Sequence, residues 1–136
     1  MERRLCMTEL SRLPKTSSIL IVDDLPEMRQ MISATLEMNG YTKVTEARNG
    51  EDAFQKIKAN SFDLAIVDLN MPKLDGIELT KKIRADFLVK KLPIIVVTAH
   101  AEQARVMAAI KAGANEFIAK PFNPDVLMQK LKKIFG

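Results

Sequence analysis

The stretch LAIVDLNMPKLDG, residues 64–76, joins four consecutive apolar residues to a carboxylate, Asp68. Four apolar residues in a row are typical of a strand buried on both faces, as in a parallel sheet covered by helices. A carboxylate is costly to bury unless it is paired, so such a strand must deliver Asp68 to a place where its charge is used. Asp75 and Gly76 then provide a turn and the cap of a following helix. The stretch therefore predicts a strand, a charged strand end and a helix, in that order.

The same order of elements recurs along residues 19–136. Apolar runs alternate with segments whose apolar residues recur at helical spacing. The expected strands are 19–22, 43–47, 64–67, 94–97 and 116–119. A helix is expected after each strand, the first from Pro26 to about Gly40, the third from about Gly76 to Ala85, and the last from Pro124. Five strands alternating with five helices predict an α/β fold, with a parallel sheet covered by helices on both faces.

Composition indicates one globular domain. The 136 residues are 47% apolar and 28% charged, which fits neither a disordered nor a fibrous chain. No apolar run is longer than five residues, whereas about 20 are needed to cross a bilayer. The single cysteine, Cys6, leaves no internal disulfide framework and favours a reducing compartment, so we expect a cytoplasmic protein. Residues 1–18 lack the apolar core of a signal peptide, and we expect a partly flexible tail there, ahead of a domain over residues 19–136.

The net charge of +4 does not indicate a nucleic-acid-binding protein. Residues 1–18 carry four basic and two acidic side chains, and the remaining charges are of mixed sign. The densest basic cluster, Lys130, Lys132 and Lys133, suits the carboxyl end of a helix. With one tyrosine and no tryptophan, few aromatic rings are available for stacking on bases.

Polar side chains are expected at the ends of four of the five strands. Because parallel strands end at one edge of the sheet, these side chains should meet there, and ligands bind in the crevice where the strand order reverses. The residues concerned are Asp23 and Asp24 after the first strand, Asp68 after the third, Thr98 after the fourth and Lys120 after the fifth. Each alone could be a helix cap, a satisfied hydroxyl or a solvated lysine. Their shared position favours a functional site.

Three carboxylates in one crevice repel each other unless one is protonated or a cation joins them. Oxygen ligands favour a hard divalent ion, Mg²⁺ or alternatively Mn²⁺. With a lysine and a hydroxyl nearby, such a site suits a phosphoryl group, and a carboxylate can act as the nucleophile that accepts it. The chain has no GxxxxGK[ST] loop and no GxGxxG motif after the first strand. We therefore expect the phosphoryl group to come from a donor other than ATP bound in such a loop.

Residues 19–136 resemble the receiver domain of response regulators. The resemblance rests on four motifs in order: VDD (22–24), VDLNMPKLDG (67–76), VTA (97–99) and AGANEFIAKPF (112–122). It implies a doubly wound, flavodoxin-like sheet with strand order 2-1-3-4-5 and five helices. The single-domain chemotaxis type, CheY-like, is the most similar. That similarity rests on Met28-Arg29, on IRAD (83–86) and LPI (92–94), and on the ending KIFG (133–136).

The resemblance implies a role for each polar residue at the strand ends. Asp68 would accept a phosphoryl group from a phosphohistidine of a partner kinase, and Lys120 would pair with the phosphoryl oxygens. Mg²⁺ would be ligated by Asp24, by Asp68 and by the backbone carbonyl of Asn70, and through water by Asp23. A cis peptide bond between Lys120 and Pro121 is an alternative to the usual trans form.

The resemblance also implies a switch, with two departures from the family pattern. Thr98 would move toward the phosphoryl group and the aromatic ring of Phe117 would turn inward, changing the surface of the fourth helix, fifth strand and fifth helix. Phe117 stands where the chemotaxis type commonly has tyrosine, so no hydroxyl is available there. His100 lies where the family sets the rate of dephosphorylation together with Asn70, although an exposed loop histidine is an equally good interpretation.

We therefore expect a phosphorylation-activated switch of a two-component system, rather than an enzyme acting beyond its own phosphoryl acceptance and autodephosphorylation. The expected partners are a CheA-like histidine kinase, a target such as the flagellar motor switch, and a phosphatase. We expect a monomer without nucleic-acid or membrane partners.

Other functions stay open at this point. The chain could be a phosphorelay intermediate or a phosphate sink without a motor target. An aspartate-nucleophile phosphatase of the haloacid-dehalogenase type uses similar residues, but its general-acid Asp would stand at Asn70, and here the acidic pair precedes the nucleophile. A binding module that is never phosphorylated does not explain the full residue set. A flavin-binding domain is disfavoured because the acidic loop after the first strand would repel the cofactor phosphate.

Overall fold

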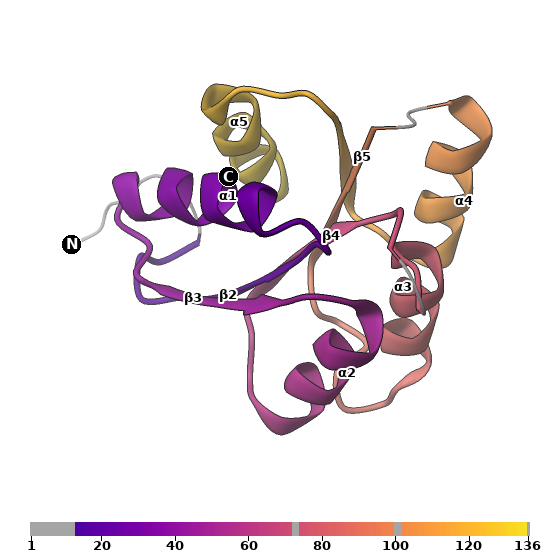
Figure 1. The fold of residues 1–136 in the computed structure, drawn as a ribbon. Coiled ribbons are helices and arrows are strands. Elements are labelled where there is room, and N and C mark those ends of the chain that lie inside the picture. The colour runs from indigo at the N-terminus through magenta and orange to yellow at the C-terminus, as the bar shows by residue number, and fades with distance from the viewer. Residues whose placement is uncertain (1–12, 72–73, 100–101, 136) are drawn as a thin grey trace.

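The computed structural model describes residues 13–71, 74–99 and 102–135, in which strands and helices alternate (Figure 1). The elements in chain order are β2 (Ser18–Val22), α1 (Pro26–Met38), β3 (Lys43–Ala47), α2 (Gly50–Ala59), β4 (Leu64–Asp68), α3 (Gly76–Ala85), β5 (Ile94–Thr98), α4 (Gln103–Ala112), β6 (Glu116–Ala119) and α5 (Pro124–Phe135). The strands and helices expected from the sequence are all present. Asp68 and Thr98 are the last residues of their strands, and Lys120 directly follows β6.

The five strands form one parallel sheet in the order β3-β2-β4-β5-β6. Counted along the chain, this is the order 2-1-3-4-5, so the predicted doubly wound topology is confirmed. The chain first moves outward from β2 to the edge strand β3, and then returns past β2 to β4, β5 and β6. The order thus reverses between β2 and β4, and a crevice is expected at the carboxyl ends of these two strands.

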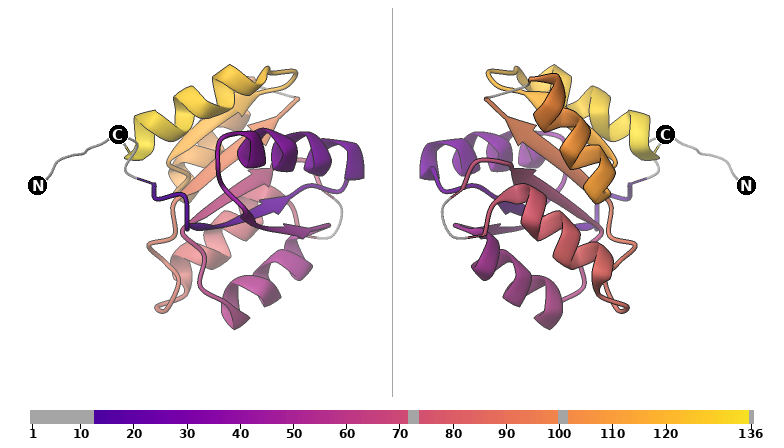
Figure 2. Two further views of the ribbon diagram at one scale, coloured as in Figure 1. Left: turned by 90° about the vertical axis from the view of Figure 1, so that its left-hand side faces the viewer. Right: turned by 90° about the vertical axis from the view of Figure 1, so that its right-hand side faces the viewer.

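Helices cover both faces of the sheet (Figures 1 and 2). On one face, α1 and α5 pack through Ile32, Leu36, Leu127 and Leu131. On the other face, α2, α3 and α4 pack through Ala53, Ile57, Leu79, Ile83 and Ala109. Because both faces are covered, every residue of β4 and β5 is buried. This explains why these strands read as continuous apolar runs in the sequence.

Short polar side chains cap the amino ends of α2, α3 and α5. Asn49 accepts a hydrogen bond from the backbone N–H of Asp52 at 2.8 Å, and Asp75 accepts one from the backbone N–H of Glu78 at 2.9 Å. These caps satisfy N–H groups that have no partner within the helix. Asp75 is therefore structural.

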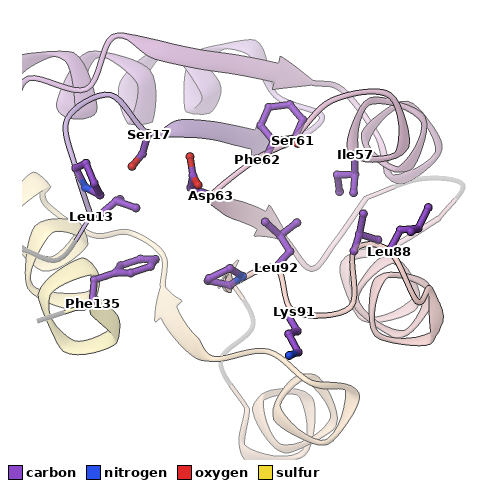
Figure 3. Close-up of a pocket in the computed structure, with 13 residues that line it drawn as sticks. Leu13, Ser17, Ile57, Ser61, Phe62, Asp63, Leu88, Lys91, Leu92 and Phe135 are labelled. Atoms are coloured by element: carbon purple, nitrogen blue, oxygen red, sulfur yellow. The ribbon is translucent and has the colours of Figure 1, made fainter.

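Figure 3 shows a cavity of about 500 Å³. Its lining includes Ser17, Asp63 and Pro93, which directly precede β2, β4 and β5, so the cavity lies at the amino ends of the strands, whereas Asp68 lies at a carboxyl end. Its wall is largely apolar and includes Leu13, Leu92 and Phe135. The carboxylate of Asp63 on this wall accepts a hydrogen bond from the backbone N–H of Ser18 at 2.8 Å. The polar residues predicted to carry function lie at the other edge, so we do not place the functional site in this cavity.

Within the described residues, no helix combines the length and the apolar character needed to span a membrane.

Candidate functional site

The carboxylates of Asp23, Asp24 and Asp68 converge at the carboxyl edge of the sheet. Each residue contributes one carboxylate oxygen to the group, and these three oxygens all lie within 4.8 Å of one another. Asp23 and Asp68 are buried, with 1% and 4% of their surface exposed, whereas Asp24 is exposed. The group therefore has two buried members and one that faces solvent, which leaves it open to an incoming ion.

The loop between β2 and α1 is held by hydrogen bonds around Asp23. Its side chain accepts from the backbone N–H of Leu25 at 2.9 Å, and its backbone N–H donates to the carbonyl of Ala47 at 3.2 Å. The guanidinium of Arg29 donates to the backbone carbonyl of Asp23 at 2.7 Å and to Glu46 at 2.8 Å. Arg29 thus ties the acidic loop to both α1 and β3. Sequence reasoning noted Arg29 as a family feature but did not assign it this contact.

Lys120 provides the cation closest to these carboxylates among the contacts that the structure describes. Its ammonium nitrogen lies 3.0 Å from Oδ2 of Asp23 and 3.5 Å from Oδ1 of Asp68. The backbone N–H of Lys120 donates to the carbonyl of Thr98 at 2.7 Å, and the bond from Lys120 to Pro121 is cis. The ammonium group of Lys120 thus pairs with two of the three carboxylates.

The electrostatics of Asp68 reflect this imbalance. Burial raises the pKa of the Asp68 carboxyl, and the neighbouring charge of Asp23 raises it further. Lys120 and the N–H of Asn70 act in the opposite direction, and Asp24 adds to the increase, so that the pKa of Asp68 is raised overall. The site would therefore be stabilised by another positive charge.

The donor set fits a hard divalent cation. Three carboxylates converge, and the backbone of Asn70 adjoins them, since its N–H donates to Oδ1 of Asp68 at 3.2 Å. Oxygen ligands of this kind are those that Mg²⁺ prefers. The chemistry of these residues thus agrees with the expected metal.

The hydroxyl of Thr98 is linked to the helix α4 through Asn70. The side-chain amide of Asn70 donates to Oγ1 of Thr98 at 3.2 Å, and its Oδ1 accepts from Arg105 at 3.0 Å. Thr98 is completely buried. Sequence reasoning placed Thr98 and Asn70 at the site but missed Arg105. The sequence around Arg105 gives no sign of this contact, because a single cation in an alanine-rich helix is usually a solvent-facing residue.

Phe117 lies on β6, beside Val96 of the neighbouring strand β5. Its ring is half-buried, and the ammonium of Lys130 lies 5.2 Å from the ring centroid. Phe117 packs against the core on the face of the sheet that α2, α3 and α4 cover, and its predicted role as a switch stays a prediction. His100, predicted to tune dephosphorylation, lies outside the described residues, as do residues 1–12 of the predicted tail with Cys6.

Comparison with known proteins points to one family. The family model described as response regulator receiver domain matches residues 19–132. Chemotaxis protein CheY1 of Helicobacter pylori is 44% identical over 119 residues, which cover 87% of this chain and 96% of that protein.

Solved structures of similar sequence share the fold. Chemotaxis protein CheY4 of Vibrio cholerae has a TM-score of 0.82 and 34% identity, over 88% of this chain and 98% of that chain. The response regulator TrrA of Thermotoga maritima, solved in complex with Mg²⁺ and BeF, has a TM-score of 0.77 and 36% identity, over 88% of this chain and 99% of that chain. The ion in the TrrA complex is magnesium, and manganese, the alternative expected from the ligand chemistry, is not supported by these comparisons.

Proposed function

This chain belongs to the response regulator receiver domain family and is CheY-like, and from this premise we propose that it is a switch activated by phosphorylation of Asp68. The observation that carries the proposal is the position of Asp68. It ends a buried strand, joins two other carboxylates, and lies 3.5 Å from the ammonium of Lys120. A nucleophile, metal-ligating oxygens and a cation for the phosphoryl oxygens are thereby combined in one place.

The proposed reaction is a phosphoryl transfer from a phosphohistidine of a partner histidine kinase. A carboxylate oxygen of Asp68 forms a bond to phosphorus, while the bond between phosphorus and the imidazole nitrogen breaks. The leaving imidazole takes up a proton, and Asp68 becomes an acyl phosphate. Lys120 is held in place by Asp23 at 3.0 Å, so its charge is already positioned for the phosphoryl oxygens before transfer.

We propose Mg²⁺ as the cofactor. When bound, it would offset the repulsion between the carboxylates and the incoming phosphoryl oxygens. Asp24, Asp68 and the backbone carbonyl of Asn70 would hold it directly, and Asp23 would do so through water. The exposed position of Asp24 supports entry of the ion from solvent.

The consequence of phosphorylation is proposed to be a change in the surface formed by α4, β6 and α5. A phosphoryl group adds up to two negative charges and three strong acceptor oxygens, which Thr98 and Lys120 could bind. Phe117 on β6 would then turn inward. Two large apolar side chains of α4, Met107 and Ile110, are already 47% and 40% exposed, and they would offer contact area to a target.

Similarity to CheY1 supports a chemotaxis role, with a CheA-like histidine kinase as donor and the flagellar motor switch as target. A phosphatase that accelerates the loss of the phosphoryl group is a further proposed partner. We propose that the protein acts as a cytoplasmic monomer and does not turn over external substrates. A phosphate sink without a motor target is the alternative.

Phosphorylation by a small donor tests the assignment of Asp68. With Mg²⁺ and acetyl phosphate, the intact mass of the wild type should rise by one phosphoryl group, and that of Asp68→Asn should not. Asp125→Asn, which changes an exposed carboxylate in the first turn of α5, serves as a control and should be labelled like the wild type. Equal labelling of Asp68→Asn would refute the proposal, and rapid hydrolysis of phosphate monoesters would favour the phosphatase alternative.

Target binding is tested separately. Flagellar motor switch protein should retain this chain more strongly when Mg²⁺ and beryllofluoride, a phosphoryl mimic, are present. Equal retention with and without beryllofluoride would support the phosphate sink.

A further inference from the structure

We propose that Arg105 is a positioning residue that acts through Asn70 to hold Thr98 in its unphosphorylated arrangement. The inference rests on the proposed function, since it concerns the hydroxyl that would bind the phosphoryl group on Asp68. It adds a residue of α4 to the switch, and thereby a physical link between that helix and the phosphorylation site.

The link consists of two consecutive hydrogen bonds. Nη2 of Arg105 donates to Oδ1 of Asn70 at 3.0 Å and lies 3.5 Å from the backbone oxygen of Leu69. Nδ2 of Asn70 in turn donates to Oγ1 of Thr98 at 3.2 Å. The side chains come from the first turns of α4, from the loop after β4 and from the end of β5. Three elements that surround Asp68 are thus connected.

The chemistry of the guanidinium fixes which group donates and which accepts in these two hydrogen bonds. A guanidinium has donors only, so it requires the carboxamide oxygen of Asn70 to face it. The NH₂ group of the same carboxamide must then face away, toward Thr98. Without Arg105, either orientation of the carboxamide would be open, and the donor to Thr98 would no longer be specified. Hydrogen bonds from charged donors are also stronger than neutral ones.

The hydrogen bond from Asn70 opposes the proposed movement of Thr98 toward a phosphorylated Asp68. A hydroxyl that turns toward a phosphoryl group on Asp68 must leave or weaken its contact with Asn70. The contact between Asn70 and Thr98 therefore stabilises the resting state, and removing this contact should favour the activated state. By the reciprocity of coupled equilibria, occupancy of the site should also loosen the contact of Arg105 with the loop after β4.

The charge of Arg105 alone would have the opposite effect. A cation near the site favours binding of an anion, so its removal would weaken anion binding. This effect would not depend on the side chain of Asn70. The sign of the change and its dependence on Asn70 thus separate positioning from simple attraction.

The experiment uses the full chain and the variants Arg105→Met, Arg105→Lys, Asn70→Ala and Arg105→Met/Asn70→Ala. Lys111→Met is the control, because Lys111 is an exposed cation in the last turn of the same helix. The first readout is the NMR resonance of the Thr98 methyl group without metal or ligand. The second is the affinity for beryllofluoride in the presence of Mg²⁺.

Arg105→Met should shift the Thr98 methyl resonance and raise beryllofluoride affinity about three- to tenfold, as expected for one partly exposed hydrogen bond to a charged group. Arg105→Lys, which keeps a charged donor, should recover part of the wild-type behaviour. In the Asn70→Ala background, Arg105→Met should have no further effect, and Lys111→Met should resemble the wild type throughout.

The inference would be overturned if Arg105→Met left the Thr98 methyl resonance unchanged. It would also be overturned if Arg105→Met lowered the affinity for beryllofluoride to a similar extent with Asn70 present and with Asn70→Ala. Either result would leave the proposed function intact. Failure of the wild type to bind beryllofluoride would instead contradict the proposed function, and this inference with it.

Discussion

The ammonium nitrogen of Lys120 lies 3.0 Å from a carboxylate oxygen of Asp23, although the two positions are 97 apart in the sequence. Parallel strands explain the encounter, because β2 and β6 both deliver the residue that follows them to the same edge of the sheet. The same nitrogen lies 3.5 Å from Asp68. One cation therefore partly neutralises a group of carboxylates that needs more positive charge than the described chain supplies there.

Replacing Lys120 by methionine should destabilise the fold in the absence of Mg²⁺. Only 11% of the lysine side chain and 2% of that of Asp23 are exposed, so the change leaves buried carboxylates without their ion pair. We expect the free energy of unfolding to fall by about 1–3 kcal/mol, as measured by urea denaturation. Added Mg²⁺ should restore part of the loss.

Lys81→Met is the matched control for that experiment. Lys81 forms an exposed pair with Glu78, with 59% and 57% of the two side chains exposed, and such pairs contribute about 0–1 kcal/mol. A Lys120→Met variant as stable as Lys81→Met without Mg²⁺ would contradict our account of the site.

Replacing Asp68 by asparagine should stabilise the protein at neutral pH in the absence of metal. Burial and the charge of Asp23 raise the pKa of Asp68 above its ordinary value of 3.8. The folded state therefore holds a proton on Asp68 in a pH range where the unfolded state has lost it. The resulting cost to stability is absent below about pH 3.8 and is fully present once the pH exceeds the raised folded pKa.

The difference in melting temperature between Asp68→Asn and the wild type should accordingly grow as the pH rises from below 3.8, the ordinary pKa of an aspartate, to neutrality. Calorimetry at several pH values in the presence of a chelator measures this. A difference that is constant with pH, or that shrinks as the pH rises, would show that the Asp68 carboxylate is not electrostatically unfavourable.

Arg29→Met should weaken Mg²⁺ binding, although Arg29 is not expected to touch the ion. Arg29 donates to the backbone carbonyl of Asp23 at 2.7 Å, and its loss should let the acidic loop move. Because residues that orient metal ligands typically contribute about 10–100-fold in affinity, we expect a decrease toward the lower end of that range by titration calorimetry. Arg48→Met should bind Mg²⁺ like the wild type, because Arg48 is an exposed cation that lines a surface pocket together with Arg29 and Glu46 but is not shown to contact Asp23.

Gly76→Ala should disturb the loop after Asp68. A Cβ at this position would lie 2.5 Å from the backbone oxygen of Asp68 and 2.7 Å from Cα of Leu69. Both obstacles are backbone atoms, so α3 or the end of β4 must shift. We expect a loss of about 1–3 kcal/mol in stability and slower labelling by acetyl phosphate at a temperature where the variant is fully folded. Labelling at the wild-type rate would show that the end of β4 tolerates this shift.

The fold could be predicted because its main determinants are local. Runs such as residues 64–67 and 94–97 are apolar without alternation, which is typical of strands in a sheet covered on both faces. Once the strands were known to be parallel, their ends had to meet, and this was enough to bring Asp68 and Lys120 together. The topology itself came from the resemblance to the family.

Other features could not be predicted, since they depend on contacts between distant segments. Arg105 meets Asn70 across 35 positions, and nothing in the sequence around Arg105 indicates where its side chain lies. A helix cap by Asp23 or Asp24 was the simple alternative to a functional role, yet the residue before α1 is Leu25, without a side-chain cap. The side chain of Asp23 instead bonds to the N–H of Leu25 and to Lys120.

The most direct test of the account is to identify the residue that carries the phosphoryl group. The wild-type chain is treated with Mg²⁺ and acetyl phosphate, reduced with borohydride, which converts an aspartyl phosphate to homoserine, and digested for peptide mass spectrometry. We predict that homoserine replaces Asp68 and no other aspartate. Homoserine at Asp23 or Asp24, or labelled protein with an unmodified Asp68, would contradict the central claim.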